Sequence, residues 1–144
     1  MQYNKSMQTR KETISVKIGN ISIGSQHPIR VQSMTNTNTS DVEATCKQIM
    51  ELYDAGSEMV RITVNDAESA KSVSEIKSIL LQKNYTVPLI GDFHFNGHIL
   101  LSKYPEAASA LDKFRINPGN IGGKEKFDAN FEKIINLAIK HNKP

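Results

Sequence analysis

The feature that most constrains the fold of this chain is a repeated unit, in which a short apolar strand ends in polar residues and is followed by a helical pattern. Candidate strands begin at positions 29, 59, 87 and 113. Their recurrence, about 25 to 30 residues, is the length of one strand-plus-helix unit in a parallel α/β protein. Four such units amount to half of an eight-unit barrel.

A hairpin is expected before these units. Residues 13–18 and 21–23 alternate apolar and polar positions around Gly19-Asn20, two residues that tolerate positive φ. We expect this hairpin to cover the bottom of the barrel or an edge of the sheet. The predicted fold class is therefore α/β, a partial (βα)8 TIM barrel of about four parallel βα units preceded by an N-terminal β-hairpin. Residues 1–12 are expected to form a polar tail, and residues 13–144 the N-terminal half of the barrel domain.

Alternation along two strands predicts which side chains share a space. Residues 59–64 place one apolar set on one face and a mixed set on the other, and residues 113–117 repeat this pattern. The outer face of such a sheet is covered by helices and must be apolar, so the polar set should point inward. The outward set is Val60, Ile62, Val64, Phe114 and Ile116; the inward set is Met59, Arg61, Thr63, Lys113, Arg115 and Asn117.

The ends of these strands predict an anion site. Arg61 and Arg115 would face the same space, and a guanidinium presents a planar fork of donors that suits phosphate. Residues 118–124 form a glycine-rich turn before a helix expected to begin near Lys124, an arrangement in which backbone N–H groups can approach an anion. Asp92 and His94 share a side of the third strand, which we expect to be the same mouth.

Helix boundaries follow from capping patterns and apolar stripes. Ser40-x-x-Glu43 resembles a capping box, with a helix from about Asp41 to Gly56, and Asn65-x-x-Glu68 predicts a second cap. The helix after that cap should run to about Gln82. A break is expected near Tyr104 before a helix with Pro105 at its first position. The apolar stripe of the second helix is Ala70, Val73, Ile76 and Leu80; that of the last is Phe127, Phe131, Ile134, Ile135, Ala138 and Ile139.

Composition narrows the class of protein. The chain has 144 residues, 38% hydrophobic and 23% charged, which suits one globular domain. Its net charge of +3 is mild and its charges are interspersed, so we expect neither nucleic acid nor membrane as a partner.

Neither a secretory signal nor a bilayer-length apolar run is present in the sequence, and a cytoplasmic location is expected. Cys46 is the only cysteine, which excludes an internal disulfide, and its place in a helical apolar pattern indicates a packing role.

Four motifs at the predicted strand ends resemble a known family. They are Val31-Gln32-Ser33-Met34-Thr35, Val60-Arg61-Ile62-Thr63, Gly91-Asp92-Phe93-His94-Phe95 and Arg115-Ile116-Asn117-Pro118-Gly119-Asn120. As a set they resemble 4-hydroxy-3-methylbut-2-enyl diphosphate synthase, an iron–sulfur oxidoreductase of the non-mevalonate isoprenoid pathway. The similarity begins near Lys11 and covers nearly the whole chain.

The resemblance implies a reductive ring opening of 2-C-methyl-D-erythritol 2,4-cyclodiphosphate, which takes up two electrons and loses water. In the family, a TIM barrel holds this substrate, and a separate domain carries a [4Fe-4S] cluster on three cysteines and a glutamate. Flavodoxin or ferredoxin donates the electrons, and the family members are homodimers. The ligands of the cluster are absent from this chain, and no metal ligand is assigned.

The resemblance also implies roles for particular residues. Arg61 and Arg115 match arginines that clamp the diphosphate, and Asn117 matches a position that contacts substrate. The further substrate-binding candidates are Asp92, His94, Gln32, Ser33 and Asn120. No catalytic residue is assigned.

The chain departs from the family in extent, since the second half of the barrel and the cluster domain are not in it. The activity of this part alone is therefore doubtful, and its open edges and exposed inner face predict self-association. Two alternative functions remain open. The chain could be a non-catalytic half-barrel that binds diphosphates, or a pterin-binding barrel similar to dihydropteroate synthase.

Overall fold

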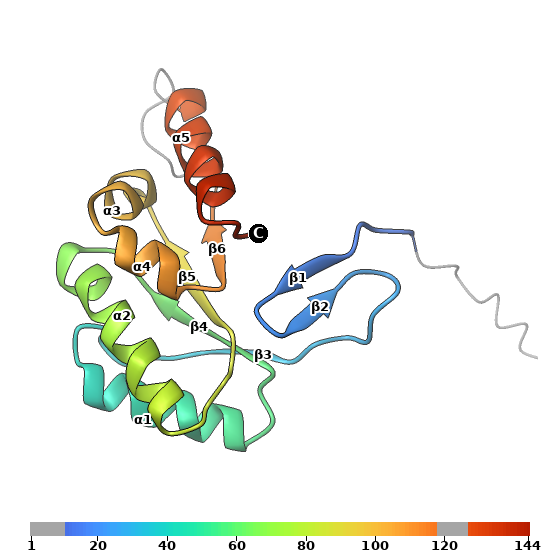
Figure 1. Cartoon of the computed structure of the whole chain (residues 1–144), viewed down its shortest axis with the longest axis vertical. Coiled ribbons are helices and arrows are strands. Elements are labelled where there is room, and N and C mark those ends of the chain that lie inside the picture. The colour runs from blue at the N-terminus through green and yellow to red at the C-terminus, as the bar shows by residue number, and fades with distance from the viewer. Residues whose placement is uncertain (1–10, 118–126) are drawn as a thin grey trace, which may run out of the picture.

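A computed structural model describes residues 11–117 and 127–144, and it has an α/β architecture (Figure 1). The described part contains a four-stranded parallel sheet in the order β3-β4-β5-β6 and a separate antiparallel hairpin. The strands are β1 Val16–Ile18, β2 Ile21–Ile23, β3 Gln32–Met34, β4 Met59–Thr63, β5 Leu89–Phe93 and β6 Lys113–Ile116. The helices are α1 Val42–Asp54, α2 Ala67–Gln82, α3 Gly97–Lys103, α4 Pro105–Ala110 and α5 Phe127–Lys140. Four parallel strands with intervening helices confirm the predicted fold class.

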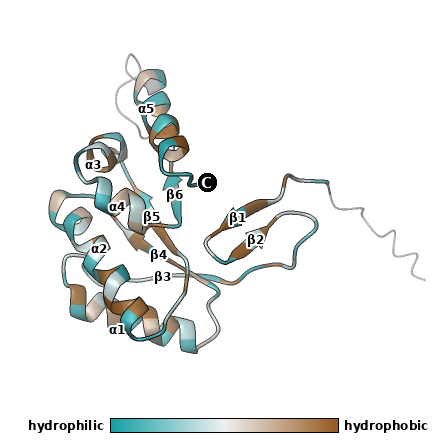
Figure 2. Ribbon diagram, in the orientation of Figure 1, coloured by the Kyte–Doolittle hydropathy of each residue, from teal (hydrophilic) through white to brown (hydrophobic). Residues whose placement is uncertain are grey.

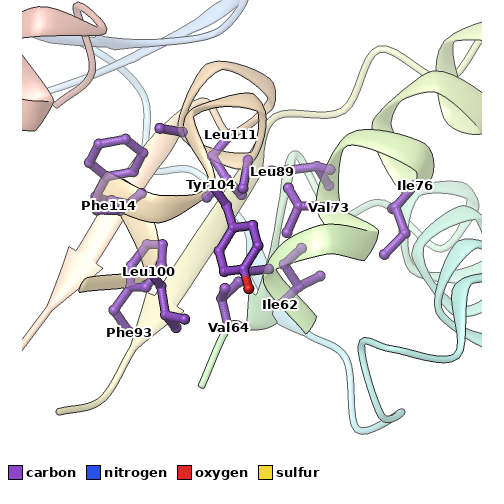
Figure 3. Packing of buried hydrophobic residues seen from close by; sticks show 14 of the residues in the cluster. Ile62, Val64, Val73, Ile76, Leu89, Phe93, Leu100, Tyr104, Leu111 and Phe114 are labelled. Atoms are coloured by element: carbon purple, nitrogen blue, oxygen red, sulfur yellow. The ribbon is translucent and has the colours of Figure 1, made fainter. Parts of the chain in front are cut away.

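The main core lies between the sheet and helices α1 to α4, which cover one of its faces (Figure 1). Val60, Ile62 and Val64 are fully buried there, as the alternation along β4 predicts. Val73 and Ile76 of α2 pack in the same cluster, so the predicted apolar stripe of this helix is confirmed (Figure 3). Burial of the outward set leaves Arg61 and Arg115 on the opposite, inner face.

The hairpin covers the amino-terminal half of that inner face. Ile18 is fully buried against Met59 and Ile90, and apolar residues of both hairpin strands pack around them. Hydrophobic residues of β1 and β2 are coloured brown in Figure 2. At Gly19, whose φ is +56°, an added Cβ would lie 3.2 Å from both Asp112 and Pro88, so the turn sits close against the base of the sheet. The expected position of the hairpin at the bottom of the barrel is confirmed. The cluster of Ile18, Met59 and Ile90 does not extend to the carboxyl-terminal half of the inner face.

The first parallel strand is shorter than predicted. The sequence indicates a strand over residues 29–34, but β3 contains only Gln32–Met34. The Val31 N–H donates to the Glu58 carboxylate at 2.9 Å, and the same carboxylate binds Arg30. The Val31 carbonyl oxygen accepts from Met59 N at 3.3 Å, but a side chain takes up the Val31 N–H, and β3 begins at Gln32, three residues later than predicted.

Two predicted helix caps are wrong by one residue. Asp41 rather than Ser40 caps α1, where its carboxylate accepts a hydrogen bond from Ala44 N at 3.0 Å. Asp66 rather than Asn65 caps α2, in a capping box completed by Ser69. A carboxylate is a strong acceptor beside the positive end of a helix dipole, which explains why the aspartate takes the cap in both cases.

The other helix boundaries agree with the predictions. Gly56 follows α1 with a φ of +104°, and α2 ends at Gln82. The break at Tyr104 and the position of Pro105 at the start of α4 are also confirmed. No helix within the described ranges is long and apolar enough to cross a membrane.

Helix α5 buries only part of its predicted apolar stripe. Ile134 is buried, whereas Ile135 is 40% exposed and Ile139 is 72% exposed. The predicted start of this helix near Lys124 lies outside the described residues. An apolar groove therefore runs between α5 and β6, lined by Phe114, Ile116, Ile134, Ile135, Ala138 and Ile139.

Candidate anion-binding site

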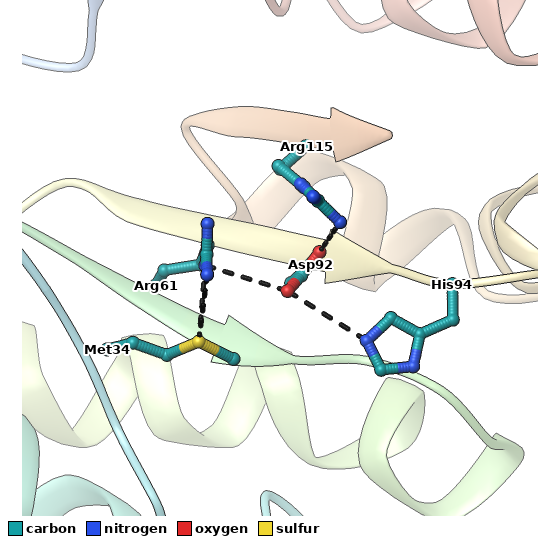
Figure 4. A network of polar contacts seen from close by, with 5 residues as sticks. All are labelled: Met34, Arg61, Asp92, His94 and Arg115. Atoms are coloured by element: carbon teal, nitrogen blue, oxygen red, sulfur yellow. Dashed lines mark hydrogen bonds and ion pairs between the residues drawn. The ribbon is translucent and has the colours of Figure 1, made fainter. Parts of the chain in front are cut away.

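Three charged side chains meet on the inner face near the carboxyl ends of neighbouring strands. Arg61 lies on β4, Asp92 on β5 and Arg115 on β6, and Asp92 stands opposite Arg115 in the register. Arg115 Nη1 donates to Asp92 Oδ1 at 2.9 Å, and Arg61 Nε lies 3.6 Å from Asp92 Oδ2 (Figure 4). The predicted convergence of the two arginines is therefore confirmed.

Burial differs among these three side chains. The Asp92 side chain is 5% exposed, whereas those of Arg61 and Arg115 are 28% and 38% exposed. One carboxylate thus lies beneath two guanidinium groups that still reach solvent, and the three groups together carry a formal charge of +1. A guanidinium has five N–H donors. The donors turned away from Asp92 can bind an anion that approaches from the open inner face.

Met34 is part of this cluster, although its sequence position alone does not mark it as a site residue. Arg61 donates to Met34 Sδ through both Nε and Nη2, each at 3.2 Å (Figure 4). Met34 stands opposite Arg61 in the parallel register, so the two side chains share a face. Because β3 has no buried apolar residues, alternation along this strand does not show that Met34 faces inward.

His94 extends the cluster beyond the end of β5. Its Nε2 lies 3.9 Å from Asp92 Oδ2, and its side chain is 44% exposed. The ring also makes an edge contact with Phe95, with the ring centroids 6.5 Å apart. The prediction that Asp92 and His94 share the mouth is confirmed.

Two of the predicted site residues lie at or beyond the end of the described range that contains β6. Asn117 directly follows β6 and is half-buried, at a position that alternation places on the side of Arg115. Asn120 and the glycine-rich turn lie outside the described residues. Their predicted contribution to the anion site remains a prediction.

The structure does not bring Gln32 or Ser33 to the mouth, so their expected position is wrong. Ser33 pairs with Val60 in the register, and its Oγ is hydrogen-bonded to Ser57, which places it on the helix-covered face. Gln32 pairs with Met59 at the amino end of the sheet, near the hairpin. Ser33 lies on the other face because it alternates with Met34, and Gln32 lies two residues before the level of Arg61.

The described residues do not fit an iron–sulfur cluster. Within them, no group of three or more histidine, cysteine or acidic residues could hold a metal ion. Cys46, the only cysteine of the sequence, is buried in the main core with its Sγ 3.8 Å from the Ile76 carbonyl oxygen. Burial, and secondarily the charge of Glu75, raises the pKa of this thiol, which disfavours the thiolate that a metal requires.

A parallel sheet with helices on one face and a cationic cluster at its carboxyl end defines a protein of the TIM-barrel class, represented here by four βα units. The comparison with known families specifies this class further. The sequence matches the GcpE TIM-barrel domain over residues 13–144, and the chain belongs to this family. The match confirms the resemblance inferred from the four motifs. Membership places the chain in an oxidoreductase family of isoprenoid biosynthesis whose members are in general iron–sulfur enzymes.

Proposed function

We propose that Arg61 and Arg115 bind the diphosphate group of 2-C-methyl-D-erythritol 2,4-cyclodiphosphate. The observation that carries this proposal is the convergence of two partly exposed guanidinium groups, from different strands, on one face. A diphosphate presents several oxygens around two phosphorus atoms, and each guanidinium can bind such oxygens through paired N–H donors. The family supports the same substrate class.

Asp92 has a positioning role in this proposal. Its carboxylate would repel a phosphate oxygen at contact distance, but it lies beneath the arginines and is almost fully buried. It holds Arg115 through a charge-assisted hydrogen bond at 2.9 Å and attracts Arg61 from 3.6 Å. Arg115 is therefore held in place before an anion arrives, which lowers the ordering cost of binding, while Arg61 is kept nearby by the same negative charge.

The proposed reaction of the full enzyme is the ring opening of this substrate to 4-hydroxy-3-methylbut-2-enyl diphosphate. The substrate takes up two electrons and two protons and loses one water molecule, and a flavodoxin or ferredoxin would be the electron donor. The described residues hold and orient the diphosphate in this scheme. They carry no redox step, because they do not fit the cluster.

The test is a binding measurement on the purified chain. Isothermal titration with inorganic pyrophosphate and with the cyclic diphosphate should show binding, and Arg61→Ala and Arg115→Ala should each weaken it about 10-fold or more, because each removes a charge-assisted contact. Lys71→Ala removes the same charge from α2, where Lys71 pairs only with Glu68 among the described residues, and should leave the affinity within about two-fold. Wild-type affinity in the Arg115 variant would refute the proposal.

A non-catalytic diphosphate-binding role would use the same two arginines. Turnover separates it from the enzymatic role. The chain is incubated with the cyclic diphosphate, a reduced ferredoxin and a separately produced cluster-bearing domain of the family, and the linear product is measured. Product formation that depends on Arg61 and Arg115 supports the enzymatic role, whereas binding without product supports the non-catalytic one.

A further inference from the structure

Met34 combines two properties that no other described methionine shares. It is 37% exposed on the open inner face, and its sulfur contacts two nitrogens of Arg61. Met59, by contrast, is buried beneath the hairpin, and Met50 packs against the main core. An accessible thioether thus lies in direct contact with one arm of the anion site.

The thioether holds Arg61 only weakly. Sulfur in methionine is a poor hydrogen-bond acceptor, so the Nε–H and Nη2–H groups that point at it can turn to a phosphate oxygen at little cost. Arg115 is held differently, because its Nη1 donates to a buried carboxylate. Arg61 is therefore the arginine whose N–H donors are free for an anion only while Met34 keeps its thioether sulfur.

We propose that Met34 is an oxidation site at which a peroxide lowers the affinity of the chain for diphosphates. A lone pair of Sδ attacks one oxygen of hydrogen peroxide, an S–O bond forms as the O–O bond breaks, and water leaves. The sulfur loses two electrons and the peroxide gains them. The product, methionine sulfoxide, is polar and is reversible by methionine sulfoxide reductases. The inference rests on the proposed function of Arg61 as a diphosphate ligand.

The consequence for binding follows from the geometry. The new oxygen is bonded to the atom at which two Arg61 N–H groups already point, 3.2 Å away. A sulfoxide oxygen accepts hydrogen bonds far better than a thioether, so it competes with the phosphate for the same donors. Because the phosphate can still bind other Arg61 donors, the net loss is about one ordinary hydrogen bond, which corresponds to an affinity about 5- to 10-fold weaker.

The experiment uses the whole chain and two matched variants. Wild type, Met34→Leu and Met50→Leu are treated with hydrogen peroxide, the oxidised methionines are located by peptide mass spectrometry, and pyrophosphate binding is titrated before and after treatment. We expect a loss of about 5- to 10-fold for wild type and Met50→Leu, with recovery after a sulfoxide reductase, and the same affinity before and after treatment for Met34→Leu.

A second readout keeps the inference separate from the proposed function. The Arg61 Nε–H resonance, assigned by its absence in Arg61→Ala, should shift when Met34 is oxidised, even without any anion. If untreated wild type fails to bind pyrophosphate, the proposed function is refuted, and the inference falls with it. If wild type binds, an oxidised Met34 with unchanged affinity, or with an unmoved Arg61 resonance, overturns the inference alone. Sulfoxide formation at Met50 before Met34 would also overturn it.

Discussion

At the scale of single residues, Asp92 explains why two arginines can lie together on an open face. Arg61 and Arg115 would repel each other without a negative charge between them, and the Asp92 carboxylate supplies it from a position that is almost closed to solvent. A ligand anion would supply a second negative charge from the opposite side. The carboxylate and the anion therefore stabilise the same arrangement of guanidinium groups.

The substitution Asp92→Asn removes this negative charge and keeps a side chain of similar size. The variant should lose about 1 to 2 kcal/mol of unfolding free energy, less than for a fully buried pair, because the partly exposed arginines can be solvated. Pyrophosphate should then stabilise the variant more than wild type, because the anion replaces the missing charge. Urea unfolding with and without pyrophosphate measures both effects. Equal stabilisation of the two proteins by pyrophosphate would contradict the positioning role of Asp92.

Alternation along the strands predicted most of the site. Arg61, Asp92 and Arg115 could be placed on one face because each lies in a strand whose other face is apolar and buried. Ser33 and Met34 could not be placed in this way. β3 has no set of buried apolar residues that would show which of its side chains face inward. Its start also depends on a contact between Val31 and Glu58, which are far apart in sequence.

At the scale of secondary-structure elements, the helices were predicted well but their first residues were not. A helix is predicted from many apolar positions, so one misread residue changes the prediction little. A helix cap, in contrast, depends on which of two adjacent polar side chains accepts a hydrogen bond from the backbone. At α1 the choice lay between Ser40 and Asp41, and both residue types are good caps. The Ser40 N–H is bound to the Asn38 side chain, so Ser40 belongs to the preceding turn and Asp41 is left to cap.

The two residues therefore make a matched pair of variants. Asp41→Ala should lower the free energy of unfolding by about 0.5 to 2 kcal/mol, because it leaves the Ala44 N–H without its acceptor. Ser40→Ala should change it by less than about 0.5 kcal/mol, as expected for a surface site that makes no cap. Urea unfolding of both variants measures the two changes in unfolding free energy. A larger loss for Ser40→Ala would restore the capping box that the sequence suggested.

At the scale of the whole molecule, the described part is a curved half of a barrel with an open inner face. The hairpin covers one end of that face, and β3 and β6 are the outer strands of the sheet within the described residues. Next to β6, the Phe114 N–H donates to the Pro144 carbonyl oxygen, so the segment after α5 returns along this edge. Ile135 and Ile139 stand exposed beside it. An apolar groove beside a sheet edge is a surface that favours association.

We propose that the isolated chain self-associates through this surface. Sedimentation velocity should show a mass that rises with protein concentration, and Ile139→Glu should shift the distribution toward monomer, because it places a charge at an apolar position of α5 that is 72% exposed. Leu81→Glu is the matched control, since Leu81 is also an exposed aliphatic residue, half-exposed on α2 and away from the groove. A mass that is independent of concentration, or an equal effect of both substitutions, would show that the α5 and β6 surface does not drive association.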